Sequence, residues 1–217
     1  MKNVYLIDHP LVKHKLALLR DVATKKCLFR DLLGELTTIV GVEAMKNLPT
    51  KKVSVKTPVV TCEQEVVDAK IAIIPILRAG LGMEEALVHL LPFADVYHVG
   101  IERDEGSLKP KEYYCKIPKS CADIIAIVAD PMLATGGSAE AVIQMLTDRG
   151  CKTIIMLSII ASPEGINAIH KKHKGVKIYT AAIDTGAGGG KGLNEKGYIV
   201  PGLGDAGDRL FGTRCKG

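Results

Sequence analysis

Aliphatic runs alternate with segments of helical periodicity through the middle of the chain. The runs Ile71–Leu77, Ile124–Ala129 and Thr153–Ile160 have the length and composition of strands that are buried on both faces. After the first two runs, apolar residues recur at spacings of three and four, over Met83–Leu91 and over Ala139–Arg149, which predicts helices. This alternation predicts an α/β protein with a parallel sheet and helices on both faces. Ligands of such sheets bind at the carboxyl ends of the strands.

The flanking segments complete the set of predicted elements. Helical stripes predict one helix that begins at His9-Pro10 and a second that is capped by Thr24 and runs through Val40. The remaining predictions are strands within Lys51–Val60 and Ala94–Ile101, a helix from Pro163 to about Lys171, and a last core strand over Val176–Ile183.

The segment Arg103–Tyr113 is charged, contains Gly106 and Pro110, and is too polar to bury, which predicts a mobile hairpin or lid. A length of 217 residues fits one domain. We expect N-terminal helices over about 9–48, a core over about 51–183 and a C-terminal hood over about 184–217.

Composition narrows the classes of protein. The chain is 47% hydrophobic and 24% charged, as is typical of globular proteins, and only 4% aromatic, which argues against a surface that stacks nucleic-acid bases. A net charge of +5 suits an anionic substrate, but the basic residues form no stripe for nucleic acid. The six cysteines form no C-x-x-C pair and indicate reduced thiols of a cytoplasmic protein. The pattern shows no signal peptide, and no apolar stretch approaches ~20 residues, so we expect no membrane span.

The strongest candidate chemistry follows the second aliphatic run. Asp130 and Pro131 end that run, and Thr135-Gly136-Gly137-Ser138 leads directly into a helix. Backbone N–H groups of such a loop, with the positive end of the helix, form a phosphate cradle. The alternative is a tight turn that only caps the helix. The adjacent acid favours a ligand with sugar hydroxyls or a magnesium complex beside its phosphate, as in a ribose phosphate.

Asp130–Ser138, with the sequence DPMLATGGS, resembles the ribose-phosphate loop of the type I phosphoribosyltransferases in their uracil branch. Further motifs that resemble this family are His9–Lys15, Pro75–Met83, Pro163–Gly165 and Gly197–Asp208. The resemblance implies the type I phosphoribosyltransferase fold, with a C-terminal hood and a hairpin lid. It also implies transfer of ribosyl phosphate from phosphoribosyl pyrophosphate (PRPP) to uracil, which gives UMP and pyrophosphate.

The resemblance also assigns residues. PRPP is expected to contact Arg78, Arg103, Asp130, Pro131, Met132, Leu133, Ala134, Thr135, Gly136, Gly137, Ser138 and Asp205. Uracil is expected to contact Ile199, Gly204, Asp205 and Ala206, and the catalytic set is Arg78, Arg103 and Asp205. Position supports Arg78 independently, because a cation after a buried strand and before Ala-Gly suits a pyrophosphate.

The resemblance implies Mg²⁺ that is carried mainly by the PRPP diphosphate, with no metal site of the protein's own. It further implies a homodimer or homotetramer, with GTP as a candidate effector and no nucleic-acid or membrane partner.

Two features depart from the family pattern: Glu102 replaces an aromatic residue before the lid arginine, and Thr185–Lys191 is a glycine-rich insertion. Three alternatives remain open on the same fold. They are a transferase for purines, a pyrimidine-sensing RNA-binding regulator, and an inactive homologue that binds PRPP or nucleotide.

Overall fold

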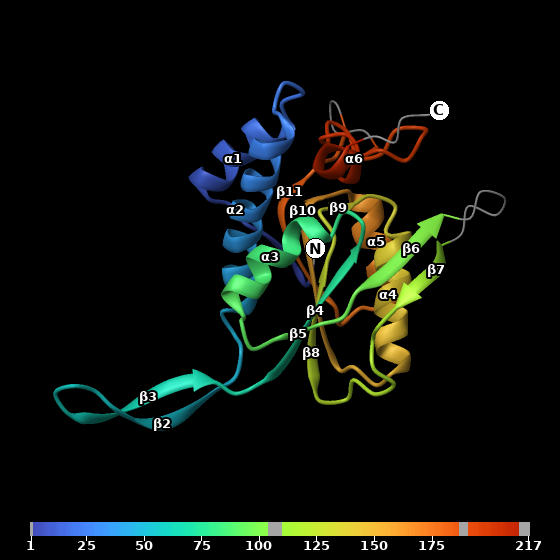
Figure 1. Ribbon diagram of the computed structural model, residues 1–217. Coiled ribbons are helices and arrows are strands. Elements are labelled where there is room, and N and C mark those ends of the chain that lie inside the picture. The colour runs from blue at the N-terminus through green and yellow to red at the C-terminus, as the bar shows by residue number, and fades with distance from the viewer. Residues whose placement is uncertain (1, 104–109, 187–190, 213–217) are drawn as a thin grey trace.

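The computed structural model describes residues 2–103, 110–186 and 191–212 and has an α/β architecture (Figure 1). In chain order the elements are β1 (Val4–Leu6), α1 (Pro10–Arg20), α2 (Lys26–Met45), β2 (Thr50–Lys56), β3 (Thr61–Val67), β4 (Lys70–Leu77), α3 (Leu81–Leu90), β5 (Asp95–Val96), β6 (Val99–Arg103), β7 (Pro110–Cys115), β8 (Ile124–Ala129), β9 (Met132–Leu133), α4 (Gly137–Asp148), β10 (Thr153–Ala161), α5 (Pro163–Lys172), β11 (Lys177–Ile183) and α6 (Ala206–Phe211).

The central sheet has the strand order β1-β11-β10-β8-β4-β6-β7, with the short β5 and β9 beside β4 and β10. Every pairing in it is parallel except that of β6 with β7. The predicted α/β class with a parallel core is therefore confirmed, and each of the three aliphatic runs forms a central strand.

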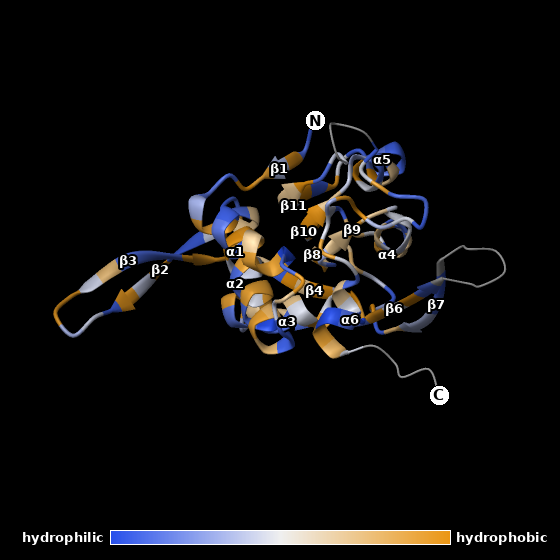
Figure 2. Ribbon diagram, turned by 90° about the horizontal axis from the view of Figure 1, so that it is seen from above, coloured by the Kyte–Doolittle hydropathy of each residue, from blue (hydrophilic) through white to orange (hydrophobic). Residues whose placement is uncertain are grey.

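Hydrophobic cores lie on both faces of the sheet. Along β8, Ile127 belongs to the core under α1, α2 and α3, whereas Ala126 and Val128 belong to the core under α4 and α5. This alternation follows from the strand repeat of two residues. Figure 2 shows the two helical layers on opposite sides of the sheet. Because both faces are covered, the open edge at the carboxyl ends of the strands is left for a ligand.

Two predicted boundaries were wrong. The second helix is not capped by Thr24: its N-cap is Lys25, which makes no side-chain cap, and the Thr24 hydroxyl instead donates to the carbonyl of Leu18. The segment Ala94–Ile101 forms two short strands, β5 and β6, rather than one. Both errors concern connections and leave the central sheet unchanged.

Strands β2 and β3 form a separate antiparallel hairpin, the arm, which projects away from the body of the molecule (Figure 1). The prediction of strands within Lys51–Val60 is confirmed only for β2, because Val59 and Val60 lie in the turn, and β3 was not predicted. Nearly all of the arm is exposed, so β3 carries no buried face and its sequence shows little alternation. The turn is closed locally, because the Thr57 hydroxyl accepts from the N–H groups of Val59 and Val60.

The predicted hairpin is present as β6 and β7, at one edge of the central sheet, which pair in antiparallel register with Glu102 opposite Lys111. Its connecting residues 104–109 lie outside the described residues. Among the described helices, none has both the length and the apolarity that crossing a membrane requires.

Candidate functional site

Arg78 and Asp130 emerge together because β4 and β8 are parallel neighbours. Pro75 pairs with Ala129, so Arg78 and Asp130 follow the two strands at the same edge of the sheet. Both residues line a cavity of about 220 Å³, the strand-tip cavity. Its full lining is Ile76, Leu77, Arg78, Ala79, Ile101, Asp130, Ser138, Asp205 and Gly207. A cation, carboxylates and a hydroxyl thus meet where the topology places a ligand.

The loop after β4 is tight and requires a glycine. A Cβ atom on Gly80 would lie 2.5 Å from the Ile76 nitrogen and 2.6 Å from the Ala129 carbonyl oxygen, both backbone atoms. The Arg78 side chain leaves this loop half exposed, and its Nη2 lies 3.4 Å from Oδ1 of Asp208. An exposed pair of this kind contributes little to stability, so it can be exchanged for contacts with an anion.

Asp130 is half-buried at the tip of β8. Burial is the main cause that raises the pKa of its carboxyl to about 7; the hydrogen bond donated by the N–H group of Met132 opposes this rise, and the nearby Asp205 adds to it. The side chain can therefore be protonated near neutral pH, and a ligand that brings positive charge or hydroxyl donors would favour its ionised form.

The cradle, Thr135–Ser138, follows β9 and includes the first two residues of α4. Gly136 has φ of +80° and precedes Gly137, the first residue of the helix, so the first-turn N–H groups are available to an anion. Thr135 is exposed, and Gly137 and Ser138 are half-buried. The acid of that first turn, Glu140, is paired with Lys172 at 2.9 Å, which offsets its charge beside the cradle.

The start of α5 supports the loop before the cradle. The Ser162 hydroxyl donates to the carbonyl of Ala134 and accepts from the N–H of Gly165. A Cβ atom on Gly165 would lie 2.5 Å from the Ala134 carbonyl oxygen and 2.6 Å from that of Leu133. The Pro163-Glu164-Gly165 motif therefore packs closely against the loop that leads into the cradle.

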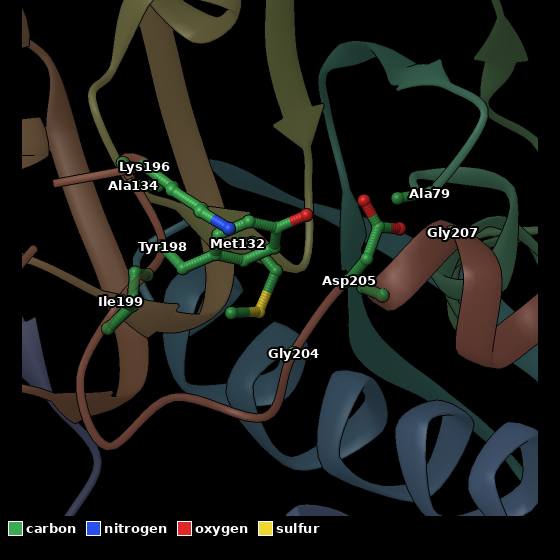
Figure 3. Close-up of a pocket in the computed structure, with 11 residues that line it drawn as sticks. Ala79, Met132, Ala134, Lys196, Tyr198, Ile199, Gly204, Asp205 and Gly207 are labelled. Atoms are coloured by element: carbon green, nitrogen blue, oxygen red, sulfur yellow. The ribbon is translucent and has the colours of Figure 1, made fainter. Parts of the chain in front are cut away.

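A second cavity, the hood cavity of about 290 Å³, adjoins the first and shares Ala79, Asp205 and Gly207 with it. Figure 3 shows Tyr198 and Met132 in this cavity and the Asp205 carboxylate at the start of α6. Its lining is Ala79, Met132, Ala134, Lys196, Gly197, Tyr198, Ile199, Gly204, Asp205, Ala206 and Gly207. All four residues expected to contact uracil are in this set.

The structure divides the expected PRPP residues into groups. Arg78, Asp130, Ser138 and Asp205 line the strand-tip cavity, whereas Met132 and Ala134 line the hood cavity. The side chains of Pro131 and Leu133 are buried, and the Pro131 carbonyl accepts from Ile159 and Ile160 in the sheet.

Arg103 ends β6, and its side chain lies outside the described part of the structure. The preceding Glu102 lies 3.9 Å from Lys111 on β7, which moderates the negative charge introduced by this departure from the family pattern.

Sequence reasoning missed several lining residues. Tyr198 and Lys196 line the hood cavity, and Ala79 lines both cavities. Tyr198 stands inside the hood motif, which is the signal that could have identified it. Ala79 likewise stands inside the Pro75–Met83 motif, whereas Lys196 lies just outside the hood motif.

Known proteins resemble the chain over its whole length. A family model described as uracil phosphoribosyltransferase matches residues 6–213. The uracil phosphoribosyltransferase of Caldanaerobacter subterraneus subsp. tengcongensis is 52% identical over 214 residues, which is 98% of this chain and 99% of that protein. The one from Clostridioides difficile is 51% identical over 215 residues, 99% of this chain and 100% of that protein.

Solved structures also resemble the chain. The AQ2163 protein from Aquifex aeolicus superposes with a TM-score of 0.88 at 34% identity and covers 97% of this chain and 98% of its own. The adenine phosphoribosyl transferase from Trypanosoma brucei superposes with a TM-score of 0.54 at 13% identity over 85% of each chain, which shows a shared fold.

The raised pKa of Asp130 predicts a pH-dependent stability. Between its ordinary value of 3.8 and about 7, the native protein binds more protons at this carboxyl than the unfolded chain does. The resulting contribution to the free energy of unfolding therefore falls as pH rises through that window and is constant above it.

Asp130→Asn should raise the melting temperature at pH 8 and leave it nearly unchanged at pH 4. Asp123→Asn, at the exposed position just before β8, controls for loss of a charge. An equal effect of Asp130→Asn at both pH values would contradict the assignment.

Proposed function

The chain belongs to the uracil phosphoribosyltransferase family, and we propose that the strand-tip cavity and the hood cavity together form its active site. The enzyme transfers the ribosyl phosphate of PRPP to uracil, giving UMP and pyrophosphate in pyrimidine salvage. The observation that carries the location is that the two cavities adjoin and share Asp205. Two substrates that react with each other need such neighbouring sites.

The strand-tip cavity and the cradle suit PRPP. We assign the 5′-phosphate to Thr135–Ser138, whose loop leads into the N-terminus of α4. We assign the ribose hydroxyls to Asp130, because a carboxylate accepts hydrogen bonds from hydroxyls and would repel a phosphate. Arg78 is assigned to the diphosphate, which its guanidinium can bind with two parallel hydrogen bonds. Arg103, at the end of the neighbouring strand β6, is assigned the same role by resemblance alone.

The hood cavity suits the flat pyrimidine. Gly204, Asp205 and Ala206 bring backbone close to this cavity, and Ile199 adds an apolar side chain. Uracil presents a carbonyl at position four, where cytosine presents an amino group. Fixed backbone donors and acceptors can therefore distinguish the two bases, because the wrong base leaves polar groups unpaired.

The reaction breaks the bond between C1 of the ribose and the diphosphate oxygen and forms the bond from C1 to N1 of uracil. Positive charge develops on the ribose and negative charge on the departing diphosphate, which Arg78 stabilises. The proton of uracil N1 leaves as the new bond forms. Asp205 lines both cavities and is our candidate group to accept that proton.

The residues present fit the implied Mg²⁺. Asp130 and Asp205 line the strand-tip cavity, and within the described ranges no group of three or more His, Cys, Asp or Glu side chains could enclose a metal. Mg²⁺ commonly takes one or two carboxylates together with phosphate oxygens and water. Bound to the diphosphate, Mg²⁺ would neutralise charge on the leaving group. Asp205 is the protein group best placed to orient that complex, because Asp130 is assigned to the ribose.

Loss of Arg78 should weaken the use of PRPP. We expect Arg78→Ala to lower kcat/KM for PRPP on the order of 100-fold, because it removes the cation that opposes the charge of the diphosphate. Lys70→Ala, at the opposite end of the same strand, should leave the activity unchanged. The measurement is conversion of radiolabelled uracil at varied PRPP, with cytosine, adenine and hypoxanthine as competing bases. Wild-type kcat/KM for PRPP in Arg78→Ala would refute the role, and preference for a purine would refute the assignment of the hood cavity.

We further propose that the chain is a homodimer or homotetramer and that the arm contributes to the contact. The support is the exposure of valines on the arm, above all Val59 and Val60, which are 92% and 62% exposed at its tip. Light scattering should give two or four times the chain mass of 23.3 kDa. Val59→Ser with Val60→Ser should lower that mass, whereas a wild-type monomer at micromolar concentration would contradict the proposal.

The remaining partners follow from the resemblance alone. We keep GTP as a candidate effector, to be tested by activity with and without GTP. A cytoplasmic location is supported by the free thiols of Cys27, Cys62, Cys115, Cys121 and Cys151.

A further inference from the structure

We propose that Arg20 and Asp184 are positioning residues for the base, because together they fix the peptide groups of Gly202, which lies between the hood-cavity residues Ile199 and Gly204. The inference rests on the proposed function of that cavity. Neither residue lines the hood cavity or the strand-tip cavity. Their effect is therefore exerted through the backbone between Ile199 and Gly204.

The contacts are short and converge on one residue. Arg20 donates from Nη1 and Nη2 to the two carboxylate oxygens of Asp184, each at 2.7 Å. The same Nη1 donates to the Gly202 carbonyl at 2.7 Å, and the Gly202 N–H donates to Oδ2 of Asp184 at 2.9 Å. Both polar groups of one peptide residue are thus held by one ion pair, which restricts rotation of the loop about that residue.

Burial makes this ion pair rigid. The Asp184 side chain is 7% exposed and that of Arg20 is 24% exposed, so water competes poorly for their hydrogen bonds. Arg20 ends α1 and Asp184 follows β11, so the pair ties the N-terminal helices to the end of the sheet. The hood is therefore positioned by residues that lie 164 positions apart in the sequence.

The loop that the pair holds turns tightly at Gly202 and separates two cavities. Gly202 has φ of +58°, and a Cβ atom there would lie 2.2 Å from the Ile199 carbonyl oxygen. Gly204 and Asp205 line the hood cavity on one side and, on the other, a cavity of about 660 Å³ that Arg20 also lines. A shift of Gly202 would therefore move the residues proposed to contact uracil.

The next carbonyl along the loop, that of Leu203, is held in a similar way. Arg209 donates to it from Nη1 at 3.1 Å, donates to the Leu19 carbonyl at 2.7 Å, and packs over the ring of Phe29. Arg20 and Arg209 thus fix consecutive carbonyl groups immediately before Gly204. Arg209 lies within α6, so its loss would also disturb the helix, and Arg20 gives the cleaner test.

Arg30 provides a matched control. It lies on α2 and donates from Nε and Nη2 to the Leu210 carbonyl at 2.9 and 2.6 Å, so it also attaches the hood to the N-terminal helices. Leu210 lines neither the hood cavity nor the strand-tip cavity. A variant of Arg30 therefore shows how the kinetics change when the hood is loosened at a point that does not contact the base.

The experiment compares steady-state kinetics of wild type, Arg20→Ala, Arg20→Lys, Asp184→Asn, the double variant Arg20→Lys with Asp184→Asn, and Arg30→Ala. We expect Arg20→Ala to raise KM for uracil about tenfold, with KM for PRPP within about twofold and kcat largely restored at saturating uracil. Asp184→Asn keeps an acceptor for the Gly202 N–H and should give a smaller rise. The double variant Arg20→Lys with Asp184→Asn should be non-additive, because the two residues act as one unit. Arg30→Ala should change neither KM by more than about twofold.

Equal rises in both KM values, or a lower melting temperature with an unchanged KM for uracil, would overturn the inference and leave a purely structural role. If Arg20→Ala does not fold, Arg20→Lys and Asp184→Asn test the inference instead, through the change in KM for uracil relative to the change in KM for PRPP. A wild-type protein without uracil activity would overturn the proposed function as well. An active wild type with unaffected variants overturns only the role of the pair.

Discussion

The parallel pairing of β4 with β8 is the constraint on which the site depends. Apolar side chains on both faces of these strands fix their register, because a slip of one residue would turn each side chain to the opposite face. The same register brings Arg78 and Asp130 out of the sheet as neighbours. The hydrophobic cores therefore set the spacing of the charges, and no long-range electrostatic interaction is needed to assemble them. The pair of strands that stabilises the core therefore also positions the side chains of the proposed site.

The C-terminal hood forms the second part of the proposed active site, beside the strand tips. In the proposed active site the strand tips supply groups for the sugar phosphate, and the C-terminal segment supplies a second wall for the base through Gly204 and Asp205. Because Asp205 lines both cavities, it is the point where the two substrates would meet. The hood in turn is held from outside by arginines of α1 and α2. Helices that lie far from the strand tips in the sequence thereby take part in shaping the site.

Much of this architecture could be predicted from the sequence, and the omissions have physical reasons. The core strands and the positions of Arg78 and Asp130 followed from aliphatic runs that end abruptly at polar residues. The hood residues followed only from family resemblance, because a glycine-rich segment has no periodicity. Strand β3 was missed because an exposed arm needs no apolar face. The Arg20–Asp184 pair carries no local signal at all, since its partners meet only after the chain has folded.

A crystal structure of the protein with UMP tests the central claim most directly, because UMP carries the phosphate, the ribose and the base in one molecule. The account predicts the phosphate on the N–H groups of Thr135–Ser138, the ribose hydroxyls on Asp130, and the uracil ring between Tyr198 and the backbone of Gly204 to Ala206. A uracil ring bound outside the hood cavity, or a phosphate bound away from the cradle, would contradict it.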